Sequence, residues 1–359
     1  MANAQVKKIV HVVGTGTIGE PLVGILNTFR ERFGIDEVTF HKRTPLLTDR
    51  SKVTVLTQKG GAKLCVDRDR WESFKQMGMT PAYEAEEALD RASVVVDCTP
   101  VGNENKEKFY KRYAGNGRGF IAQGSEYGFG KMYARGINDR ALDRKTDQFL
   151  QVVSCNTHNL AVLIDTIALG PEKEDNLEEG RFVCMRRAND LSQEGEFIPA
   201  PEVGKHDDPR FGTHQGRDAH YVFKTLGLDL DIYSSAIKLN TQYMHTIYFN
   251  LKLNRPVKMD EVMRRIKGNP RIALTNKKSS ASVFSFGRDH GIFGRILNQT
   301  VLASNTLAMK GDRELVGMCF TPQDGNSLLS SLAGTLWFLH PDFYEEPLEA
   351  LQPYFFSEI

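Results

Sequence analysis

The stretch Lys8-Ile9-Val10-His11-Val12-Val13-Gly14-Thr15-Gly16-Thr17-Ile18-Gly19 decides the fold of the first half of the chain. A β-branched run leads directly into GxGxxG, and residues 21–26 have helical character. A dinucleotide-binding fingerprint requires this strand–turn–helix context. In such a fingerprint Gly14 permits the tight turn, Gly16 lets the backbone approach a pyrophosphate, and Gly19 allows close packing of helix on strand. The alternative is a glycine-rich turn in an unrelated α/β domain.

Further strand and helix signals alternate through the rest of this half. The expected strands are residues 37–40, 53–56, 62–66, 93–99 and 119–122. The expected helices are residues 71–74 and 84–92. This alternation predicts an α/β fold with a doubly wound parallel sheet of the Rossmann type.

The second expected strand ends in His41-Lys42-Arg43. NAD-binding sites usually place Asp or Glu there, to bind the ribose 2′-hydroxyl. Two cations, Lys42 and Arg43, suit a 2′-phosphate instead, through charge and guanidinium geometry. The sequence therefore favours NADP as the cofactor over NAD. The alternative is a solvated basic loop.

A single cysteine, Cys155, stands where a strand ends at residues 152–153 and apolar residues resume at 160–164. This pattern predicts a strand running into a helix, with the thiol at or near the helix N-terminus. The helix dipole and free N–H groups there favour a thiolate and can stabilise an oxyanion. The alternative is a buried structural cysteine.

The second half has a different pattern. Strands are expected at residues 180–188, 236–240, 241–251 and 272–274, and helices at 260–267 and 326–339. Residues 195–216 and 279–294 are expected to form loops. The strands predict a larger mixed sheet in an α+β catalytic domain.

Composition excludes several classes of protein. A chain of 359 residues suggests two domains, and a formal net charge of +1 gives no sign of a nucleic-acid or membrane partner. No apolar run is long enough to span a bilayer, and residues 1–8 lack a signal-peptide core. The five scattered cysteines form no CxxC pair, so we expect neither a disulfide framework nor a metal site. Their scatter and odd number lead us to expect a cytoplasmic location.

Several motifs occur together in one order along the chain. They are Gly14–Gly19, Asp97-Cys98-Thr99-Pro100, Ser154-Cys155-Asn156-Thr157, Arg186-Arg187-Ala188-Asn189-Asp190, Thr213-His214-Gln215-Gly216, Met244-His245 and Gln323-Asp324. With them, most of the chain resembles the archaeal-type (type II) glyceraldehyde-3-phosphate dehydrogenases.

The resemblance implies a role for particular residues. Cys155 would be the nucleophile and His245 the general base, while a substrate- and phosphate-binding group would comprise Ser154, Asn156, Thr157, Arg186, His214, Gln215 and Arg217. The cofactor would contact Gly14, Gly16, Thr17, Ile18, Gly19, Lys42, Arg43, Gly124, Arg187 and Gln323. It also implies a homotetramer, and a discontinuous nucleotide domain formed by residues 1–153 and 322–359 around a catalytic domain of residues 154–321.

The sequence departs from the family pattern near the expected phosphate sites. His158 and Asn159 follow the cysteine motif where Thr and Gly are usual, and Asp324-Gly325 replaces Glu-Ser. Gln215 replaces the second histidine of a His-His pair, and Arg217 replaces a proline, where it could add an anion contact.

The predicted reaction is the oxidation of glyceraldehyde 3-phosphate, with inorganic phosphate and NAD(P)⁺, to 1,3-bisphosphoglycerate. The Cys155 thiolate would form a thiohemiacetal and then a thioester, with His245 taking the proton. Alternatives are a relative acting on erythrose 4-phosphate or a semialdehyde, and a nucleotide-binding regulator without catalysis. For single residues, Arg186 and Arg187 could mark a surface strand end, His245 could be a core histidine, and His158 could face solvent or lie near Cys155.

Overall fold

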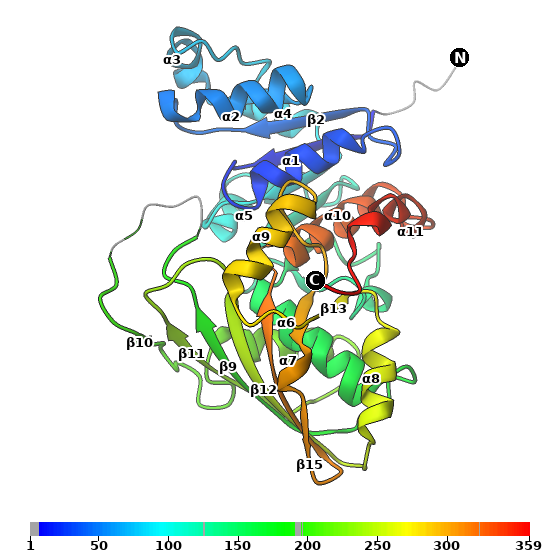
Figure 1. Ribbon diagram of the computed structural model, residues 1–359. Helices are drawn as coiled ribbons and strands as arrows, with labels where there is room; N and C mark the ends of the chain where they lie inside the picture. The colour runs from blue at the N-terminus through cyan, green and yellow to red at the C-terminus, as the bar shows by residue number, and fades with distance from the viewer. Residues whose placement is uncertain (1–6, 125, 191–194, 196, 323) are drawn as a thin grey trace. The chain divides into compact units, whose positions relative to one another are not determined.

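The computed structural model describes residues 7–124, 126–190, 195, 197–322 and 324–359. The chain forms two compact units (Figure 1). The first unit comprises Met1–Lys131, Asp143–Val152 and Ser330–Gln352, and the second unit comprises Met132–Leu142, Val153–Leu329 and Pro353–Ile359. Within the described residues, no helix has the length and apolar character needed to cross a membrane.

The first unit is built on an eight-stranded sheet with the order β4-β3-β2-β1-β5-β6-β8-β7. Its strands are β1 (Ile9–Val13), β2 (Glu37–His41), β3 (Lys63–Val66), β4 (Tyr83–Glu84), β5 (Val94–Asp97), β6 (Gly119–Gln123), β7 (Lys131–Tyr133) and β8 (Phe149–Val152); of β7, only Lys131 is assigned to the first unit. Every pair of neighbours from β4 through β8 is parallel. The chain moves outward from β1 to β4 and then returns to β5, on the other side of β1, as in a Rossmann sheet. The predicted doubly wound sheet is confirmed.

Helices connect these strands. They are α1 (Gly19–Thr28), α2 (Arg50–Thr54), α3 (Trp71–Gln76), α4 (Ala85–Arg91) and α5 (Gly102–Lys108); α11 (Glu345–Leu348), near the C-terminus, belongs to the same unit but connects no strands. The later part of α10 (Gly325–Leu339) also belongs to this unit. Its Phe338 ring packs on Gly119 of β6 so closely that a Cβ at residue 119 would lie 2.1 Å from a ring carbon. The absence of a side chain at Gly119 therefore lets the C-terminal segment pack on this sheet.

The expected strand at residues 53–56 is wrong. These residues lie in α2 and in a π-helical turn, Val55–Lys59, that continues it. Val53 and Leu56 are buried, whereas Val55 is 48% exposed. Burial three residues apart is the periodicity of a helix, and a strand would have put Val53 and Val55 on the same face. The β-branched residues suggested a strand, but the helical burial pattern prevails.

The second unit contains a mixed sheet with the order β10-β11-β9-β12-β16-β14-β13, and β15 pairs with β16. The strands are β9 (Leu177–Arg186), β10 (Glu202–Val203), β11 (Ile232–Lys238), β12 (His245–Leu253), β13 (Ile272–Thr275), β14 (Thr300–Ala303), β15 (Ala308–Lys310) and β16 (Glu314–Thr321). The β11–β9 and β13–β14 pairs are parallel, and the other pairs are antiparallel. The predicted mixed sheet is confirmed.

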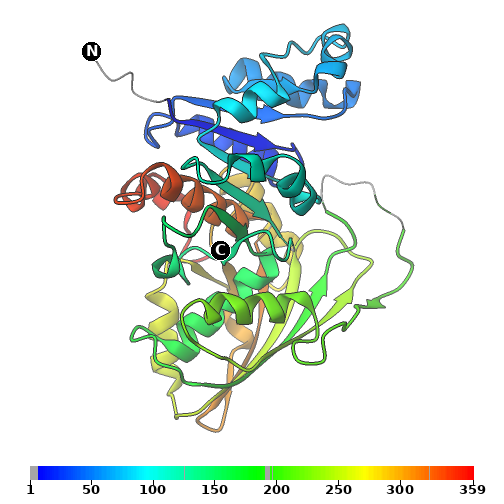
Figure 2. The same ribbon diagram turned by 180° about the vertical axis from the view of Figure 1, so that it is seen from behind.

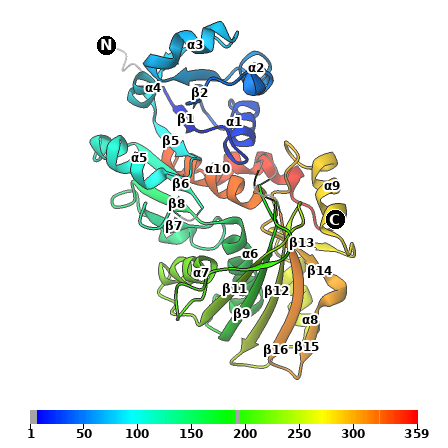
Figure 3. The same cartoon turned by 90° about the vertical axis from the view of Figure 1, so that its left-hand side faces the viewer.

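Three helices pack on one face of this sheet: α6 (Cys155–Leu163), which continues as a π-helical turn at Ile164–Leu169, α7 (His214–Lys224) and α8 (Met259–Lys267). On the other face, Val283 of α9 (Ser280–His290) packs with Val301 and Phe320, whose strand neighbours Leu302 and Cys319 point toward α6. The strands lie in front of α6 and α7 in Figure 1 and behind them in Figure 2, and Figure 3 shows α7 alongside β11. In β12, Ile247, Phe249 and Leu251 are buried in the core, whereas the intervening Tyr248 is 36% exposed.

The two expected loops of this half are only partly loops. Residues 279–294 contain α9, which begins at Ser280 and is capped by Ser279, whose hydroxyl accepts the Ala281 N–H at 3.2 Å. Val283 and Gly287, four residues apart, are its buried positions. A serine cap and two small buried residues gave too weak a periodic signal to indicate a helix. Residues 195–216 include β10 and the first turn of α7.

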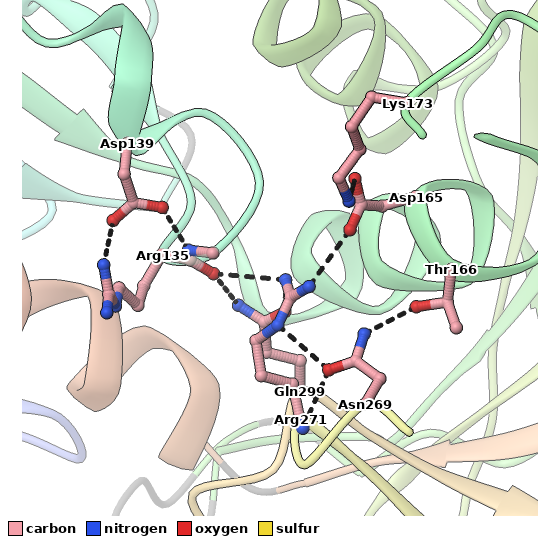
Figure 4. Close-up of polar contacts among 9 residues, drawn as sticks. Arg135, Asp139, Asp165, Thr166, Lys173, Asn269, Arg271 and Gln299 are labelled. Carbon is pink, nitrogen blue, oxygen red and sulfur yellow. Dashed lines mark hydrogen bonds and ion pairs between the residues drawn. The ribbon is translucent and has the colours of Figure 1, made fainter. Parts of the chain in front are cut away.

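A buried ionic network fixes the far end of α6 (Figure 4). Asp165 in the π-helical turn is only 1% exposed and binds Lys173 at 2.6 Å and Arg271 at 3.0 Å. Arg271 also donates to Gln299 and Asn269, both at 3.1 Å. A buried charge is tolerated when it is paired in this way, and loss of one partner is costly. The helix that starts at Cys155 is therefore held at its opposite end.

Candidate functional site

The glycine turn of the first unit has the geometry that its sequence predicts. Gly14 has φ +92°, a backbone conformation that favours glycine. A Cβ at Gly19 would lie 2.0 Å from the Gly14 carbonyl oxygen, so α1 packs on the turn only because residue 19 has no side chain. A Cβ at Gly16 would meet nothing within 4 Å. The turn thus has an open face at Gly16, where the backbone of a dinucleotide-binding turn approaches the pyrophosphate.

The neighbouring residues complete this edge of the sheet. Thr17 and Ile18 lead into α1, and Ile18 occupies the N-cap position without a capping side chain. No side chain caps α1, but the Glu20 N–H donates to the Gly16 carbonyl oxygen at 3.1 Å and Pro21 has no N–H, so in the first turn the Gly19 N–H is the group placed to serve an anion. Gly124 follows β6, has φ +70°, and would also meet open space with a Cβ. These residues fit a bound dinucleotide.

The basic end of β2 is more heavily paired than the sequence suggests. Lys42 is buried, and its Nζ lies 2.5 Å from Oδ2 of Asp49. Arg43 is exposed. Lys52 lies on the other side of Asp49 at 3.6 Å, and its Nζ donates to the Thr15 carbonyl oxygen at 3.2 Å. Sequence reasoning missed Asp49 and Lys52, because nothing in their spacing indicates that the chain returns them to the end of β2.

Cys155 is the first residue of α6, as predicted. Ser154 is the N-cap, and its hydroxyl accepts the Thr157 N–H at 3.3 Å. Asn156 is buried, and its Oδ1 accepts the Thr321 hydroxyl at 3.0 Å. The three neighbours of Cys155 thus hold the start of the helix in place. Whether they also bind substrate stays a prediction.

The electrostatic surroundings of Cys155 oppose the expected thiolate. Burial raises the pKa of the thiol to about 12, and the negative charge of Asp324 acts in the same direction. Arg187 and Arg186 act in the opposite direction, without outweighing burial. The helix N-terminus is expected to favour a thiolate, whereas burial disfavours one, and the ionisation of Cys155 stays a prediction.

His245 begins β12 and is buried. Burial, and then the charges of Arg187 and Arg186, lower its pKa well below the usual value, so the ring is neutral at neutral pH. Its Nδ1 accepts the backbone N–H of Arg187 at 3.1 Å. A neutral ring with Nδ1 as acceptor carries its proton on Nε2. In this tautomer Nε2 donates a hydrogen bond, and it would accept a proton only after the contact with Arg187 changes.

Arg187 joins the parts of this site. Its side chain is 3% exposed, and its Nη2 lies 2.7 Å from Asp190 and 3.6 Å from Asp324. It affects the pKa of both Cys155 and His245. Arg187 is thus an internal part of the cysteine site. The cofactor contact that the resemblance implies for it stays a prediction.

A second link connects Cys155 and His245. Thr321, which binds Asn156, is the β16 partner of His245 in the sheet register. The structure therefore brings Cys155 and His245 into one neighbourhood of the second unit.

Asp324 lies buried in the cysteine site, which its sequence context does not indicate. It has φ +54°, and it is 7% exposed. Burial raises its pKa, although Arg187 and Arg295 lower it. Among the described residues, its Oδ2 has no hydrogen-bond partner. The sequence had marked Asp324 only as a departure from the family pattern, and its neighbour Gln323, a predicted cofactor contact, lies outside the described residues.

A basic group occupies the start of α7. His214 is its first residue, and burial together with the charges of Arg186 and Arg217 lowers the His214 pKa to about 4. Arg217 donates from Nε and Nη2 to Oδ1 of Asp218, at 3.0 and 2.9 Å. Gln215 is buried, and its side-chain oxygen accepts the Thr213 hydroxyl. The arrangement offers two cations beside a neutral imidazole, which suits an anion.

His158 does not face solvent. It is fully buried in α6, its Nδ1 lies 3.0 Å from the Ser154 carbonyl oxygen, and burial lowers its pKa to about 4. Its ring therefore braces the turn that presents Cys155. Among the described residues, no group of three or more His, Cys, Asp and Glu side chains is placed to hold a metal ion.

Comparison with known proteins gives a consistent family of relatives. The chain is 25% identical over 318 residues to glyceraldehyde-3-phosphate dehydrogenase of Pyrobaculum islandicum, with 84% of each chain covered. It is 25% identical over 319 residues to the Sulfolobus acidocaldarius enzyme, covering 86% of this chain and 85% of that one. This chain is a distant relative of the archaeal glyceraldehyde-3-phosphate dehydrogenases.

The similarity to archaeal glyceraldehyde-3-phosphate dehydrogenases extends beyond those two organisms. Glyceraldehyde-3-phosphate dehydrogenase 1 of Methanosarcina barkeri is 28% identical over 294 residues, with 79% of each chain covered. No family model matches the chain. The resemblance that the motifs predicted is thus confirmed at the level of a distant relationship spanning both units.

Proposed function

We propose that this protein is an NAD(P)-dependent phosphorylating aldehyde dehydrogenase that acts on glyceraldehyde 3-phosphate. The observation that carries the proposal is the grouping of Cys155, His245 and Arg187 at the start of α6 and β12. The relationship to dehydrogenases of that name supports the substrate. The predicted cytoplasmic location and homotetramer form part of the same proposal.

The first unit would hold the dinucleotide. Gly14, Gly16 and Gly19 form the turn, and the start of α1 with Thr17 and Ile18 would face the pyrophosphate. The chemistry that a bound nicotinamide supplies is hydride acceptance. Either NADP or NAD could be the cofactor, and we propose that NADP is preferred because of Lys42 and Arg43.

The Cys155 sulfur would attack the aldehyde carbonyl carbon. Because burial raises the pKa of this thiol to about 12, little thiolate exists beforehand, and the proton must leave as the bond forms. Arg187 and Arg186 favour the thiolate as it develops. His245 is neutral and can take a proton at Nε2, provided that its Nδ1 releases the Arg187 N–H and takes the other tautomeric form.

The carbonyl oxygen gains negative charge in the same step. The free N–H groups at the start of α6 are suited to stabilise it, and in the tautomer described the Nε2–H of His245 can also donate to it. An acyl group held as a thioester on Cys155 would then be open to attack by inorganic phosphate. Arg186, His214 and Arg217 would bind the phosphate groups.

The test is an assay of reduced nicotinamide by absorbance, with purified protein, glyceraldehyde 3-phosphate and NADP⁺ or NAD⁺. We expect sustained turnover only when phosphate or arsenate is present, and none with Cys155→Ser. Turnover that is independent of phosphate, or full activity in Cys155→Ser, would overturn the proposal.

The Arg217–Asp218 pair favours a second candidate, a related dehydrogenase acting on another aldehyde such as erythrose 4-phosphate or a semialdehyde. The Arg217 guanidinium forms an ion pair with Asp218. The anion site therefore contains a paired arginine where the family pattern has a proline. A substrate panel ranked by kcat/KM separates the candidates. Higher kcat/KM for glyceraldehyde 3-phosphate than for the other aldehydes favours the first.

A further inference from the structure

The carboxylate of Asp49 occupies the end of β2, where the sequence places only cations. The strand ends at His41, and the following residues are Lys42 and Arg43. A short 3₁₀ turn, Leu47–Asp49, brings Asp49 back so that its Oδ2 lies 2.5 Å from Lys42 Nζ. An acidic group at this end of the second strand is what binds the ribose 2′-hydroxyl in NAD sites of this fold.

The position of Asp49 is fixed relative to the glycine turn. The Gly14 N–H donates to the His41 carbonyl oxygen at 3.1 Å, which joins the end of β2 to the turn. Lys52 bridges Asp49, at 3.6 Å, and the Thr15 carbonyl oxygen, at 3.2 Å. Asp49 is therefore attached to the turn that would carry the pyrophosphate, within the same unit.

The charges around Asp49 leave it ionised. Partial burial would raise its pKa, but the hydrogen bond and charge of Lys42, with the charge of Lys52, outweigh burial and lower the pKa. The Asp49 side chain is 22% exposed, so its carboxylate retains accepting positions beyond those used by the lysines. Lys42 is largely neutralised by this pair, and its own side chain is only 10% exposed.

We infer that Asp49 sets the choice between NAD and NADP, an inference that rests on the proposed dinucleotide site. Its carboxylate accepts the ribose 2′-hydroxyl of NAD. It repels the 2′-phosphate of NADP, which carries roughly two negative charges at neutral pH. Lys42, Arg43 and Lys52 attract that phosphate, so Asp49 shifts a basic site toward acceptance of NAD.

The experiment measures the Kd of NAD⁺ and NADP⁺ by calorimetry on the full chain, because the two dinucleotides differ only in the 2′-phosphate. In Asp49→Asn we expect weaker NAD⁺ binding and tighter NADP⁺ binding. The ratio of the two constants should move toward NADP⁺ by about tenfold, the size of one unit charge at a partly exposed site. Asp49→Ala gives the same comparison if the Asn variant does not fold.

Asp36→Asn is the matched control. Asp36 is exposed and lies just before β2, at the opposite end of the strand from Asp49. The substitution Asp36→Asn removes the same charge as Asp49→Asn. An unchanged ratio in Asp36→Asn with a shifted ratio in Asp49→Asn supports the inference. An unchanged ratio in Asp49→Asn, or an equal shift in both variants, overturns it while leaving the dinucleotide site intact. If the unaltered protein binds neither dinucleotide, the proposed function fails and the inference with it.

Discussion

The glycine turn of the first unit and the cysteine site of the second unit were both predicted from short motifs, yet they differ in how much the motif decides. At the turn, the backbone geometry determines the structure, and Gly14, Gly16 and Gly19 have the geometry that their spacing predicts. At Cys155, the motif predicts the position of the thiol, whereas burial and Asp324, which the motif does not show, raise the pKa of the thiol. Backbone geometry is encoded locally, whereas a pKa depends on side chains from distant parts of the chain.

The largest expected effect tests the cysteine site itself. Cys155→Ser should lower kcat/KM at least about a thousandfold, since a hydroxyl cannot replace the thiol nucleophile. The measurement is the rate of reduced-nicotinamide formation with saturating phosphate. Cys65→Ala, which alters a buried cysteine of the first unit, should leave that rate within about threefold of the unaltered protein. Comparable losses in both variants would contradict a special role for Cys155.

Two substitutions of His245 separate its possible roles. His245→Ala should lower kcat about a hundredfold or more, as expected when an acid–base group is lost. His245→Asn keeps a side-chain donor but cannot take up a proton. If Asn restores most of kcat, the ring acts by hydrogen-bond donation, in the tautomer that the Arg187 contact imposes. If Asn is as poor as Ala, His245 acts as a base and the Arg187 contact must change during turnover.

Two glycine substitutions test the glycine turn of the first unit. Gly16→Ala should leave unfolding by urea nearly unchanged, because its Cβ meets open space, while dinucleotide affinity falls about tenfold or more. Gly19→Ala should lower the free energy of unfolding by about 1–3 kcal/mol, because its Cβ would lie 2.0 Å from the Gly14 carbonyl oxygen. Unchanged dinucleotide affinity in Gly16→Ala would mean that the turn does not approach the cofactor.

The smallest effect concerns the pKa of Cys155. The Asp324 carboxylate disfavours the thiolate, so Asp324→Asn should lower the pKa of Cys155 and speed alkylation by iodoacetamide severalfold at a given pH below that pKa. A pH series of alkylation rates should move to lower pH. Asp190→Asn should shift the profile in the same direction by less, because Asp190 acts more weakly on the thiol. A profile unmoved by Asp324→Asn would show that burial alone sets the pKa.

The sequence predicted what local patterns can encode. The Rossmann sheet, the mixed sheet and the start of α6 at Cys155 follow from residue period, glycine spacing and the strand and apolar residues on either side of the cysteine. The strand expected at residues 53–56 is wrong, and the segment expected to be rich in loop at 279–294 is mostly α9, because tertiary burial decided both segments.

Contacts between residues that are far apart along the chain could not be predicted from the sequence. The Arg187 N–H reaches His245 across 58 residues, and Asn156 reaches Thr321 across 165. Asp49 lies close to Lys42 in sequence, yet only the path of the 3₁₀ turn shows that the two meet. Such pairs set the tautomer, the pKa and the local charge, which are the properties that a motif does not determine.

The proposed reaction requires that Cys155 carry an acyl group between hydride transfer and attack by phosphate, and mass spectrometry of the protein after a single turnover tests this requirement. Glyceraldehyde 3-phosphate and the oxidised dinucleotide are added without phosphate, and the digested protein is examined for a mass increase. We expect an acylated peptide containing Cys155, and we expect the acyl group to be lost when phosphate is added. An unmodified Cys155 peptide after reduced nicotinamide has formed, or an acyl group on another residue, would contradict it.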